Sequence, residues 1–182
     1  MNEVEMKGGR MTKVLFVCMG NICRSPTAEA VFRRLAAQRG LLSELEIDSA
    51  GTHGYHVGES PDARTQRAAA ERKYDLSQIV ARKVAPEDLE YFDIVLAMDR
   101  SNLDALRKLC PPDRVQRLKL FMSYARQFDD DEVPDPYYGL AHDFDLVLDM
   151  IEDAAEGLLD NIARERSGKD GTRAPRKAAR AH

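Results

Sequence analysis

The stretch that most constrains the fold is residues 13–29, which reads Lys-Val-Leu-Phe-Val-Cys-Met-Gly-Asn-Ile-Cys-Arg-Ser-Pro-Thr-Ala-Glu. The apolar run over residues 14–17 has the composition of a buried β-strand and leads directly into Cys18. After a short loop, Ser25 and Pro26 have the residue types of a helix start, with serine as a cap and proline in the first turn. A strand, a tight loop and a helix in this order predict an α/β fold with Cys18 at the carboxyl end of the first strand.

Strand and helix patterns alternate along the rest of the chain. Strand-like runs cover residues 45–50, 93–98 and 115–121, whereas helical spacing of apolar residues covers 26–39, 61–73, 100–110 and 144–162. This alternation predicts a three-layer α/β sandwich, with a four-stranded, mostly parallel sheet and helices on both faces. Ligands of such sheets bind beyond the carboxyl ends of the strands, which is where Cys18 lies.

Length and charge predict one domain with two flanking segments. The 182 residues are 43% hydrophobic, enough for a single core, which we expect over residues 13–166. Residues 1–12 are predicted to be a disordered lead and residues 167–182 a disordered basic tail that is either solvated or bound to an anionic partner. From Ser167 the tail carries five basic residues and one acid, so the chain's net charge of −4 leaves the preceding body at −8. An acidic body argues against a nucleic-acid partner.

Cysteine usage and hydropathy indicate the compartment. Three cysteines without framework spacing fit a reducing environment better than a disulfide scaffold. No apolar run approaches the ~20 residues that a membrane span needs, and the start lacks the pattern of a signal peptide. We therefore expect a cytoplasmic protein, with a monomer favoured over an oligomer.

The loop after Cys18 has the residues of an anion site. Gly20 and Asn21 readily accept left-handed backbone conformations, so a loop of Met19, Gly20, Asn21, Ile22 and Cys23 can turn its N–H groups inward. Such N–H groups and a helix N-terminus bind a phosphate-like anion without a lysine, and the planar fork of Arg24 can hold two of its oxygens. The same donors, with the hydroxyl of Ser25, stabilise a thiolate at Cys18 as the nucleophile.

Phosphoryl transfer from an aryl ester also needs an acid for the leaving oxygen, and Asp135 is the candidate. Pro134 and Pro136 restrict its backbone and can hold the carboxyl over the pocket, first as general acid and then as base for water. Three tyrosines are predicted to wall a slot for a flat leaving group, although one of them is expected to pack in the core instead: Tyr55, Tyr137 and Tyr138.

Cys23 has two interpretations. It lies five residues after Cys18 on the same loop, and a disulfide between them would protect the thiolate from irreversible oxidation if the Cα atoms come within ~7 Å. We predict this redox role, with plain packing as the alternative.

Several motifs resemble the low-molecular-weight protein tyrosine phosphatases over residues 13–163. They are Val-Cys-x-Gly-Asn-Ile-Cys-Arg-Ser-Pro-x-Ala-Glu-Ala, Ser49-Ala50-Gly51-Thr52, Ser60-Pro61-Asp62, Met98-Asp99-x-Ser101-Asn102-Leu103 and Asp135-Pro136-Tyr137-Tyr138-Gly139. The resemblance implies hydrolysis of phosphotyrosine in proteins through a cysteinyl phosphate, without a metal or other cofactor. It also implies Cys18 as nucleophile, Arg24 as phosphate clamp and Asp135 as general acid, with Asn21 holding the loop's shape. The chain departs from the family pattern at Ile79, where many relatives carry a histidine.

Other functions compete with this one. An arsenate reductase on the same fold needs two further cysteines as electron relays, and Cys110 is the only one in the sequence outside the loop. Phosphoarginine phosphatases resemble this loop with a threonine in place of Ile22, whose apolar side chain favours an aryl phosphate. A non-enzymatic phosphate-binding module would lack Cys18 or Asp135.

Overall fold

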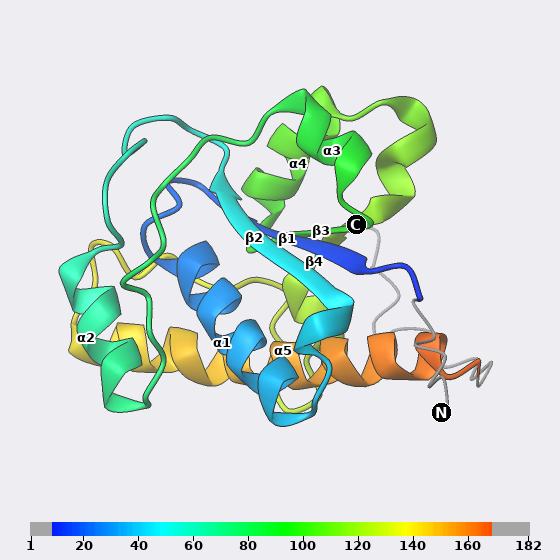
Figure 1. Ribbon diagram of the computed structural model, residues 1–182. Helices are drawn as coiled ribbons and strands as arrows, with labels where there is room; N and C mark the ends of the chain where they lie inside the picture. The colour runs from blue at the N-terminus through cyan, green and yellow to red at the C-terminus, as the bar shows by residue number, and fades with distance from the viewer. Residues whose placement is uncertain (1–8, 169–182) are drawn as a thin grey trace.

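A parallel sheet lies between two layers of helices in the computed structural model, which describes residues 9–168 (Figure 1). The sheet has four strands in the order β2-β1-β3-β4, and each neighbouring pair is parallel. The strands are β1 (Thr12–Cys18), β2 (Leu45–Gly51), β3 (Ile94–Ala97) and β4 (Leu118–Leu120). The predicted α/β sandwich with helices on both faces is confirmed.

The helices divide between the two faces of the sheet. Helices α1 and α5 cover one face, with α2 packed beside α5, and α3 and α4 contribute to the core on the other face. The α-helices are α1 (Arg24–Gln38), α2 (Ala63–Glu71), α3 (Pro86–Tyr91), α4 (Arg100–Leu109) and α5 (Ala141–Arg166), and the 3-10 helices are η1 (Leu42–Glu44), η2 (Pro112–Arg117) and η3 (Phe121–Tyr124).

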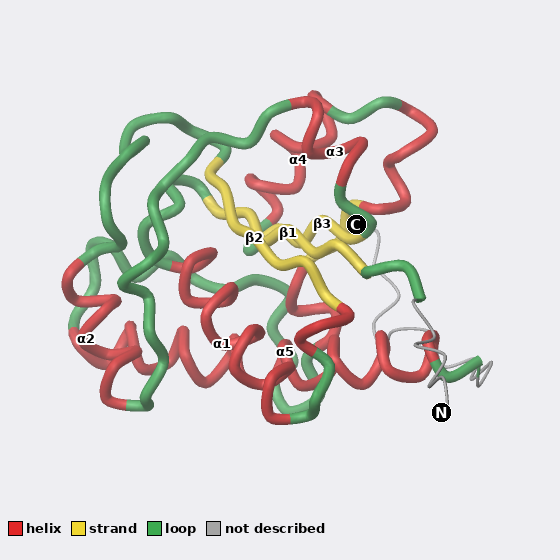
Figure 2. Tube along the Cα trace, viewed as in Figure 1, coloured by secondary structure: helices red, strands yellow, loops and turns green. Residues whose placement is uncertain are grey.

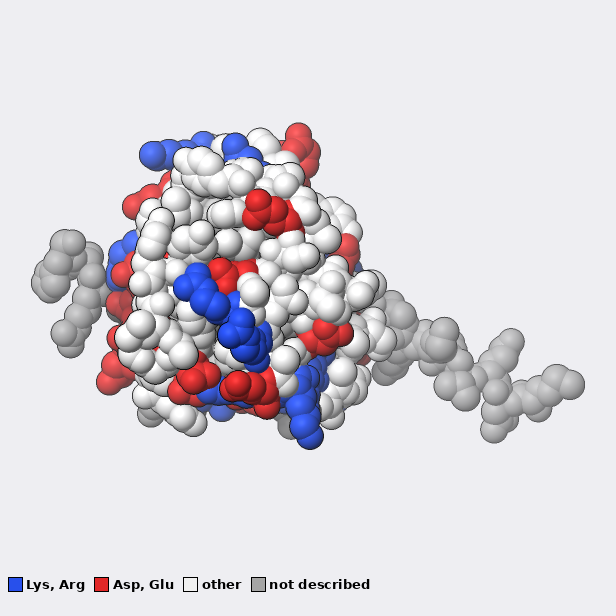
Figure 3. All heavy atoms as spheres, turned by 90° about the vertical axis from the view of Figure 1, so that its left-hand side faces the viewer, with Lys and Arg blue, Asp and Glu red and all other residues white. Residues whose placement is uncertain are grey.

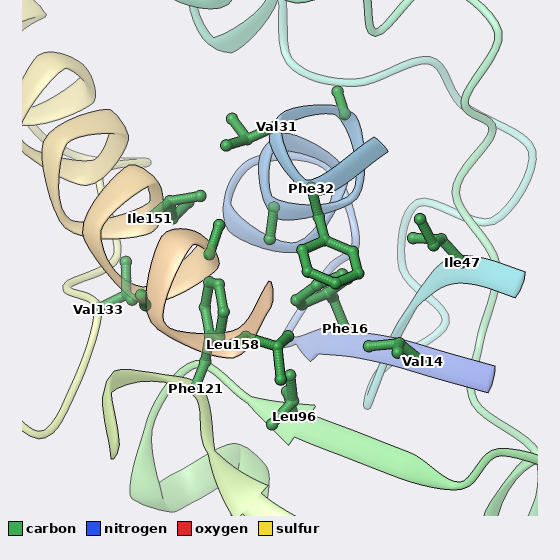
Figure 4. Packing of buried hydrophobic residues seen from close by; sticks show 14 of the residues in the cluster. Val14, Phe16, Val31, Phe32, Ile47, Leu96, Phe121, Val133, Ile151 and Leu158 are labelled. Atoms are coloured by element: carbon green, nitrogen blue, oxygen red, sulfur yellow. The ribbon is translucent and has the colours of Figure 1, made fainter. Parts of the chain in front are cut away.

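Strand β1 is buried on both sides, which explains its unbroken apolar run. On the α1/α5 side, Phe16 makes edge-to-face contacts with Phe32 and Phe121, with ring centroids 5.5 and 5.1 Å apart (Figure 4). On the α3/α4 side, Leu15 and Val17 are fully buried. Burial of each such side chain is worth roughly 1.5–3 kcal/mol. The strand that ends at Cys18 is therefore held firmly in the middle of the sheet.

The strand order predicts where a ligand binds. The chain runs from β1 to β2 on one side and then crosses to β3 on the other side of β1. The order thus reverses between β1 and β3, and such a switch point leaves a crevice at the carboxyl ends of the strands. The loops that follow β1 and β2 both lie at this end of the sheet (Figure 2).

Some expected boundaries were wrong. The strand predicted over residues 115–121 is the short edge strand β4, which pairs with β3 over three residues and is flanked by η2 and η3. Proline at the start of η2 favours a helical turn there. Helix α2 begins at Ala63, after Pro61, because Asp62 caps it by accepting a hydrogen bond from the Arg64 N–H.

The flanking segments lie mostly outside the described residues. Of the predicted lead, Thr12 is already paired with Leu45 in β1, one residue before the expected start of the fold, and Arg10 forms an ion pair with Asp93 at 2.8 Å. Residues 1–8 and 169–182 are not described, so the disorder expected for the lead and the basic tail stays a prediction. Within residues 9–168, no helix is long and apolar enough to cross a membrane.

Candidate active site

The loop between β1 and α1 has the backbone of an anion cradle. Asn21 adopts a left-handed conformation with φ of 55°. Gly51, at the end of β2, permits a close approach of the loop, because a Cβ there would lie 2.8 Å from the Met19 carbonyl oxygen. Loop carbonyls accept hydrogen bonds from outside the loop, at Cys18 from the Thr52 N–H and at Met19 from the His53 N–H, both at 2.9 Å. Among the backbone bonds of the described loops and turns, none is donated by residues 19–23. These N–H groups therefore remain available to an anion.

The nucleophile candidate sits at the floor of this cradle. Cys18 is 3% exposed, and its Sγ lies 3.0 Å from the Ser25 hydroxyl oxygen. The expectation that Ser25 caps the helix was wrong. The N-cap is Cys23 and helix α1 begins at Arg24, two residues earlier than a cap at Ser25 implies, and the Ser25 hydroxyl lies next to the thiol instead. A hydroxyl in this position can donate a hydrogen bond to a thiolate.

Asn21 ties the loop to two other segments. Its Nδ2 donates to Ser25 Oγ at 2.8 Å and to Ser49 Oγ at 3.0 Å, and its Oδ1 accepts from the Arg82 N–H at 3.0 Å. Ile79, the residue at which we expected a departure from the family pattern, packs against the hydrophobic core. The asparagine is therefore held by Ser49 and a backbone N–H from the segment after residue 79.

Arg24 is buried and fixed from the side of β3. Its Nη1 donates to Asp99 Oδ2 at 2.7 Å and to the Val133 carbonyl at 2.9 Å. Burial acts to lower the pKa of Arg24, but its electrostatic interactions with Cys18, Asp99 and Asp135 outweigh burial and hold the pKa above its ordinary value. The guanidinium stays positive beside the thiol. Asp99 is the expected N-cap of α4, accepting from the Asn102 N–H at 2.8 Å, but its bond to Arg24 was missed because nothing in the local sequence reveals it.

The proline-flanked carboxyl approaches the same arginine from a distant part of the chain. Asp135 Oδ2 lies 3.6 Å from Arg24 Nη2, and the Asp135 side chain is 44% exposed. Its Oδ1 accepts a hydrogen bond from the Tyr137 N–H at 3.1 Å, which fixes the carboxyl over its own turn. The fold thus brings Cys18, Arg24 and Asp135 to one site, and their catalytic roles stay predictions.

The three tyrosines are not equivalent. Tyr137 is half-buried and packs against a small cluster that includes Ile22, Cys23 and Phe144. Tyr138 is 96% exposed and meets Tyr137 edge to face, with ring centroids 4.9 Å apart. Tyr55 is also exposed and stacks on His53, so the expectation that one of the three is largely packed applies to Tyr137.

One aromatic residue near the loop was missed. The ring of His56 lies against Gly20, where a Cβ would come within 3.1 Å of it, and is tilted toward the Tyr137 ring at 6.4 Å. His56 Nδ1 is 2.7 Å from Glu59 Oε2. The sequence feature that could have indicated His56 is its position directly after Tyr55, which was itself a predicted site residue. Figure 3 views the molecule from the side where these loops lie, and charges of both signs are scattered there among uncharged residues.

The remaining cysteines are free thiols in the structure. Cys23 is buried, and its burial raises the pKa of the thiol to about 12. It lines a small cavity together with Pro136 and Phe144. Cys110 is only partly buried and packs against the opposite core, away from the loop. Within the described residues no group of three or more His, Cys, Asp or Glu could hold a metal ion.

The fold and the site together define the class of cysteine-dependent phosphatases. Residues 13–168 match the family model described as low molecular weight phosphotyrosine protein phosphatase, and the chain belongs to that family.

The chain is similar to individual relatives over nearly their whole length. The chain is 44% identical to a putative low molecular weight protein-tyrosine-phosphatase of Synechocystis, slr0328, over 84% of this chain and 98% of the relative. The crystal structure of YfkJ from Bacillus subtilis is similar with a TM-score of 0.82 and 40% identity, covering 87% of this chain and 99% of YfkJ. A Drosophila arginine phosphatase is similar with a TM-score of 0.77 and 32% identity, covering 83% and 98%.

Proposed function

We propose that this protein hydrolyses phosphotyrosine in protein substrates through a phosphorylated Cys18, without a metal ion. The observation that carries the proposal is the cradle itself, in which a buried thiol lies below a loop whose N–H groups donate none of the described backbone bonds. A buried, charged arginine completes the cradle. Preorganised donors of this kind stabilise the charge on the equatorial oxygens of a transferring phosphoryl group.

The proposed reaction has two displacements. The Cys18 thiolate attacks phosphorus and forms the S–P bond while the P–O bond to the tyrosine oxygen breaks, and the Asp135 carboxyl gives its proton to that oxygen. A water molecule then attacks the phosphorus, Asp135 takes a proton from it, and the S–P bond breaks to release phosphate. Arg24 and the N–H groups of residues 19–23 hold the oxygens through both steps.

The apolar side chains next to the phosphate-binding loop favour an aryl phosphate as substrate. Ile22 is 7% exposed and belongs to the apolar cluster on which Tyr137 packs. A flat phenyl ring can lie between such apolar side chains, whereas a phosphoarginine would bring a polar guanidinium into the same place without a partner. Phosphoarginine is the competing substrate, because an arginine phosphatase is among the similar structures.

We further infer that the protein acts in the cytoplasm. All three cysteines are free, and a nucleophilic thiol persists in a reducing compartment.

The test is a kinetic comparison of phosphotyrosine, phosphoserine and phosphoarginine peptides in the presence of a chelator. We expect phosphotyrosine to be hydrolysed at least about a hundredfold faster than the others, and Cys18→Ser to abolish turnover. Ile22→Thr is expected to raise the relative rate on phosphoarginine. Faster hydrolysis of phosphoarginine by the wild type would reassign the substrate, and full activity of Cys18→Ser would remove the nucleophile.

A further inference from the structure

Arg64, in the first turn of α2, contacts the loop that carries Asp135. Its Nη2 donates a hydrogen bond to the Tyr137 carbonyl oxygen at 2.8 Å. The guanidinium also lies over two aromatic rings, 5.5 Å from the centroid of Tyr137 and 4.9 Å from that of Phe144. No role of Arg64 follows from its position in the sequence, because Tyr137 is more than seventy residues away.

Through Asp62, the same guanidinium is also connected to the phosphate-binding loop. Its Nε and Nη2 donate to the two carboxylate oxygens of Asp62 at 3.1 and 3.0 Å. Asp62 in turn donates its own N–H to the Ile22 carbonyl at 2.8 Å. The arginine therefore bridges the loop around Cys18 and the segment of the general acid, and a planar fork is needed to serve both sides at once.

The segment of residues 134–139 has few other attachments. Within the described residues, two of its hydrogen bonds are internal, from the Tyr137 N–H to the Asp135 carboxylate and from the Gly139 N–H to the Pro136 carbonyl. Among the described residues, the bond from Arg64 is the single hydrogen bond that joins this segment to another part of the chain, and the only other polar tie is the ion pair of Asp135 with Arg24 at 3.6 Å. The Tyr137 carbonyl that it holds belongs to the residue whose N–H fixes the Asp135 carboxyl.

We propose that Arg64 is a positioning residue for the general acid, which holds the Asp135 turn over Cys18 by anchoring Tyr137. The inference rests on the proposed function. An exposed ion pair alone contributes little to stability. Here, however, the ion pair with Asp62 orients the Arg64 guanidinium, and its third hydrogen bond reaches the Tyr137 carbonyl in the turn that carries Asp135. Without Arg64, the turn keeps its internal bonds and loses its tie to α2, so the carboxyl samples positions that are too far from the leaving oxygen.

The experiment measures kcat/KM for aryl phosphates with leaving groups of different pKa. We expect Arg64→Met to lower kcat/KM for phenyl phosphate about tenfold and for p-nitrophenyl phosphate less than about twofold, because a good leaving group needs little protonation. Arg64→Lys is expected to show most of the same loss of kcat/KM for phenyl phosphate, since a lysine cannot make the three hydrogen bonds together. The Asp62 cap survives in both variants because it uses the backbone N–H of residue 64.

Two controls separate positioning from a general structural loss. Arg67→Met removes an exposed arginine of the same helix and is expected to leave kcat/KM unchanged. Inhibition by vanadate should stay within about twofold in Arg64→Met, because the cradle around Cys18 is intact. Equal losses for good and poor leaving groups, or weakened vanadate binding, would overturn the positioning role.

A double variant distinguishes failure of this inference from failure of the proposed function. If Arg64 acts through Asp135, adding Arg64→Met to Asp135→Asn should lower kcat/KM for phenyl phosphate less than about twofold further. An independent tenfold loss in the double variant would overturn the inference while the proposed function stands. If Asp135→Asn itself shows no dependence on the leaving group, the assignment of Asp135 as the acid fails first.

Discussion

Asp99 serves two elements at once, accepting a hydrogen bond from Arg24 through Oδ2 at 2.7 Å and from the Asn102 N–H through Oδ1 at 2.8 Å. The residue therefore caps α4 and also holds the guanidinium of Arg24 in place beside the phosphate-binding loop. These two roles can be separated by mutation, because asparagine is as good a helix cap as aspartate but carries no charge.

Asp99→Asn is expected to keep the helix cap and to weaken the hold on Arg24, which lowers kcat/KM for p-nitrophenyl phosphate about tenfold. A hydrogen bond between charged groups is worth roughly 1.5–3 kcal/mol, so this loss is of the right size. Asp99→Ala removes the cap as well and should unfold at lower urea concentration than Asp99→Asn. Wild-type activity in Asp99→Asn would show that the Val133 carbonyl alone is sufficient to orient Arg24.

Substitutions at Asn21 separate backbone conformation from side-chain contacts. Asn21→Gly and Asn21→Ala both lose the bonds to Ser25, Ser49 and Arg82, but only alanine resists the φ of 55°. We expect similar losses of kcat/KM in both variants, and a free energy of unfolding that is about 1–2 kcal/mol lower for alanine than for glycine. Urea denaturation measures the difference, and equal stabilities would contradict a strained loop.

A buried carboxyl in α1 predicts a pH dependence of stability. Glu29 is 4% exposed, and burial, opposed by the charge of Arg33 and reinforced by Asp48, raises the pKa of its carboxyl from 4.5 to about 7. The folded state therefore binds a proton more tightly than the unfolded state does. This contribution to stability is fully present below pH about 4.5 and is lost as the pH rises through about 7.

The contribution of Glu29 to the pH dependence of stability can be isolated by replacing its carboxyl with an amide. Glu29→Gln keeps a donor toward Asp48 and does not titrate, so its free energy of unfolding should fall less between pH 4.5 and 7.5 than that of the wild type. The difference is expected to approach about 3 kcal/mol, from the linkage between pKa shift and stability. Glu71→Gln, at an exposed position of α2, is the matched control and should follow the wild-type profile. Parallel profiles for Glu29→Gln and wild type would exclude a neutral Glu29.

The redox role of Cys23 stays a prediction with a defined pH dependence. Peroxide oxidises the Cys18 thiolate to a sulfenic acid as its O–O bond breaks and hydroxide leaves. The Cys23 thiolate then attacks the sulfenic sulfur, so that the S–S bond forms and the S–O bond breaks to release hydroxide, which takes a proton from solvent. Because the pKa of Cys23 is raised to about 12, its thiolate fraction is small at neutral pH and grows about tenfold for each unit of pH.

The measurement follows the disulfide by mass spectrometry after a pulse of peroxide that catalase ends. Closure of the bond should accelerate steeply from pH 6 to 9, and Cys23→Ser should instead accumulate the sulfinic acid at Cys18. Cys110→Ser is the control, because Cys110 packs against the opposite core and should not alter either result. If Cys23→Ser is as well protected as the wild type, Cys23 has a packing role only.

Much of the fold was predictable because local patterns were consistent with one another. The apolar run of β1 is buried on both faces, and the amphipathic patterns of α1 and α5 match their contacts. The edge strand β4 was predicted too long, because the strand-like run of residues 115–121 is divided among the end of η2, the three residues of β4 and the first residue of η3. At the edge of a sheet, pairing with a single neighbour decides the length of a strand more than residue type does.

The sequence by itself determined the cradle, because Cys18, Arg24 and Ser25 are separated by a few residues between a strand and a helix, and short-range backbone geometry brings them together. The tertiary structure decided what surrounds it. Asp99, Asp135 and Arg64 come from three segments that meet only because the strand order reverses beside β1 and the chain returns to the same end of the sheet. Their contacts depend on orientation across the fold, which no local pattern of residues encodes.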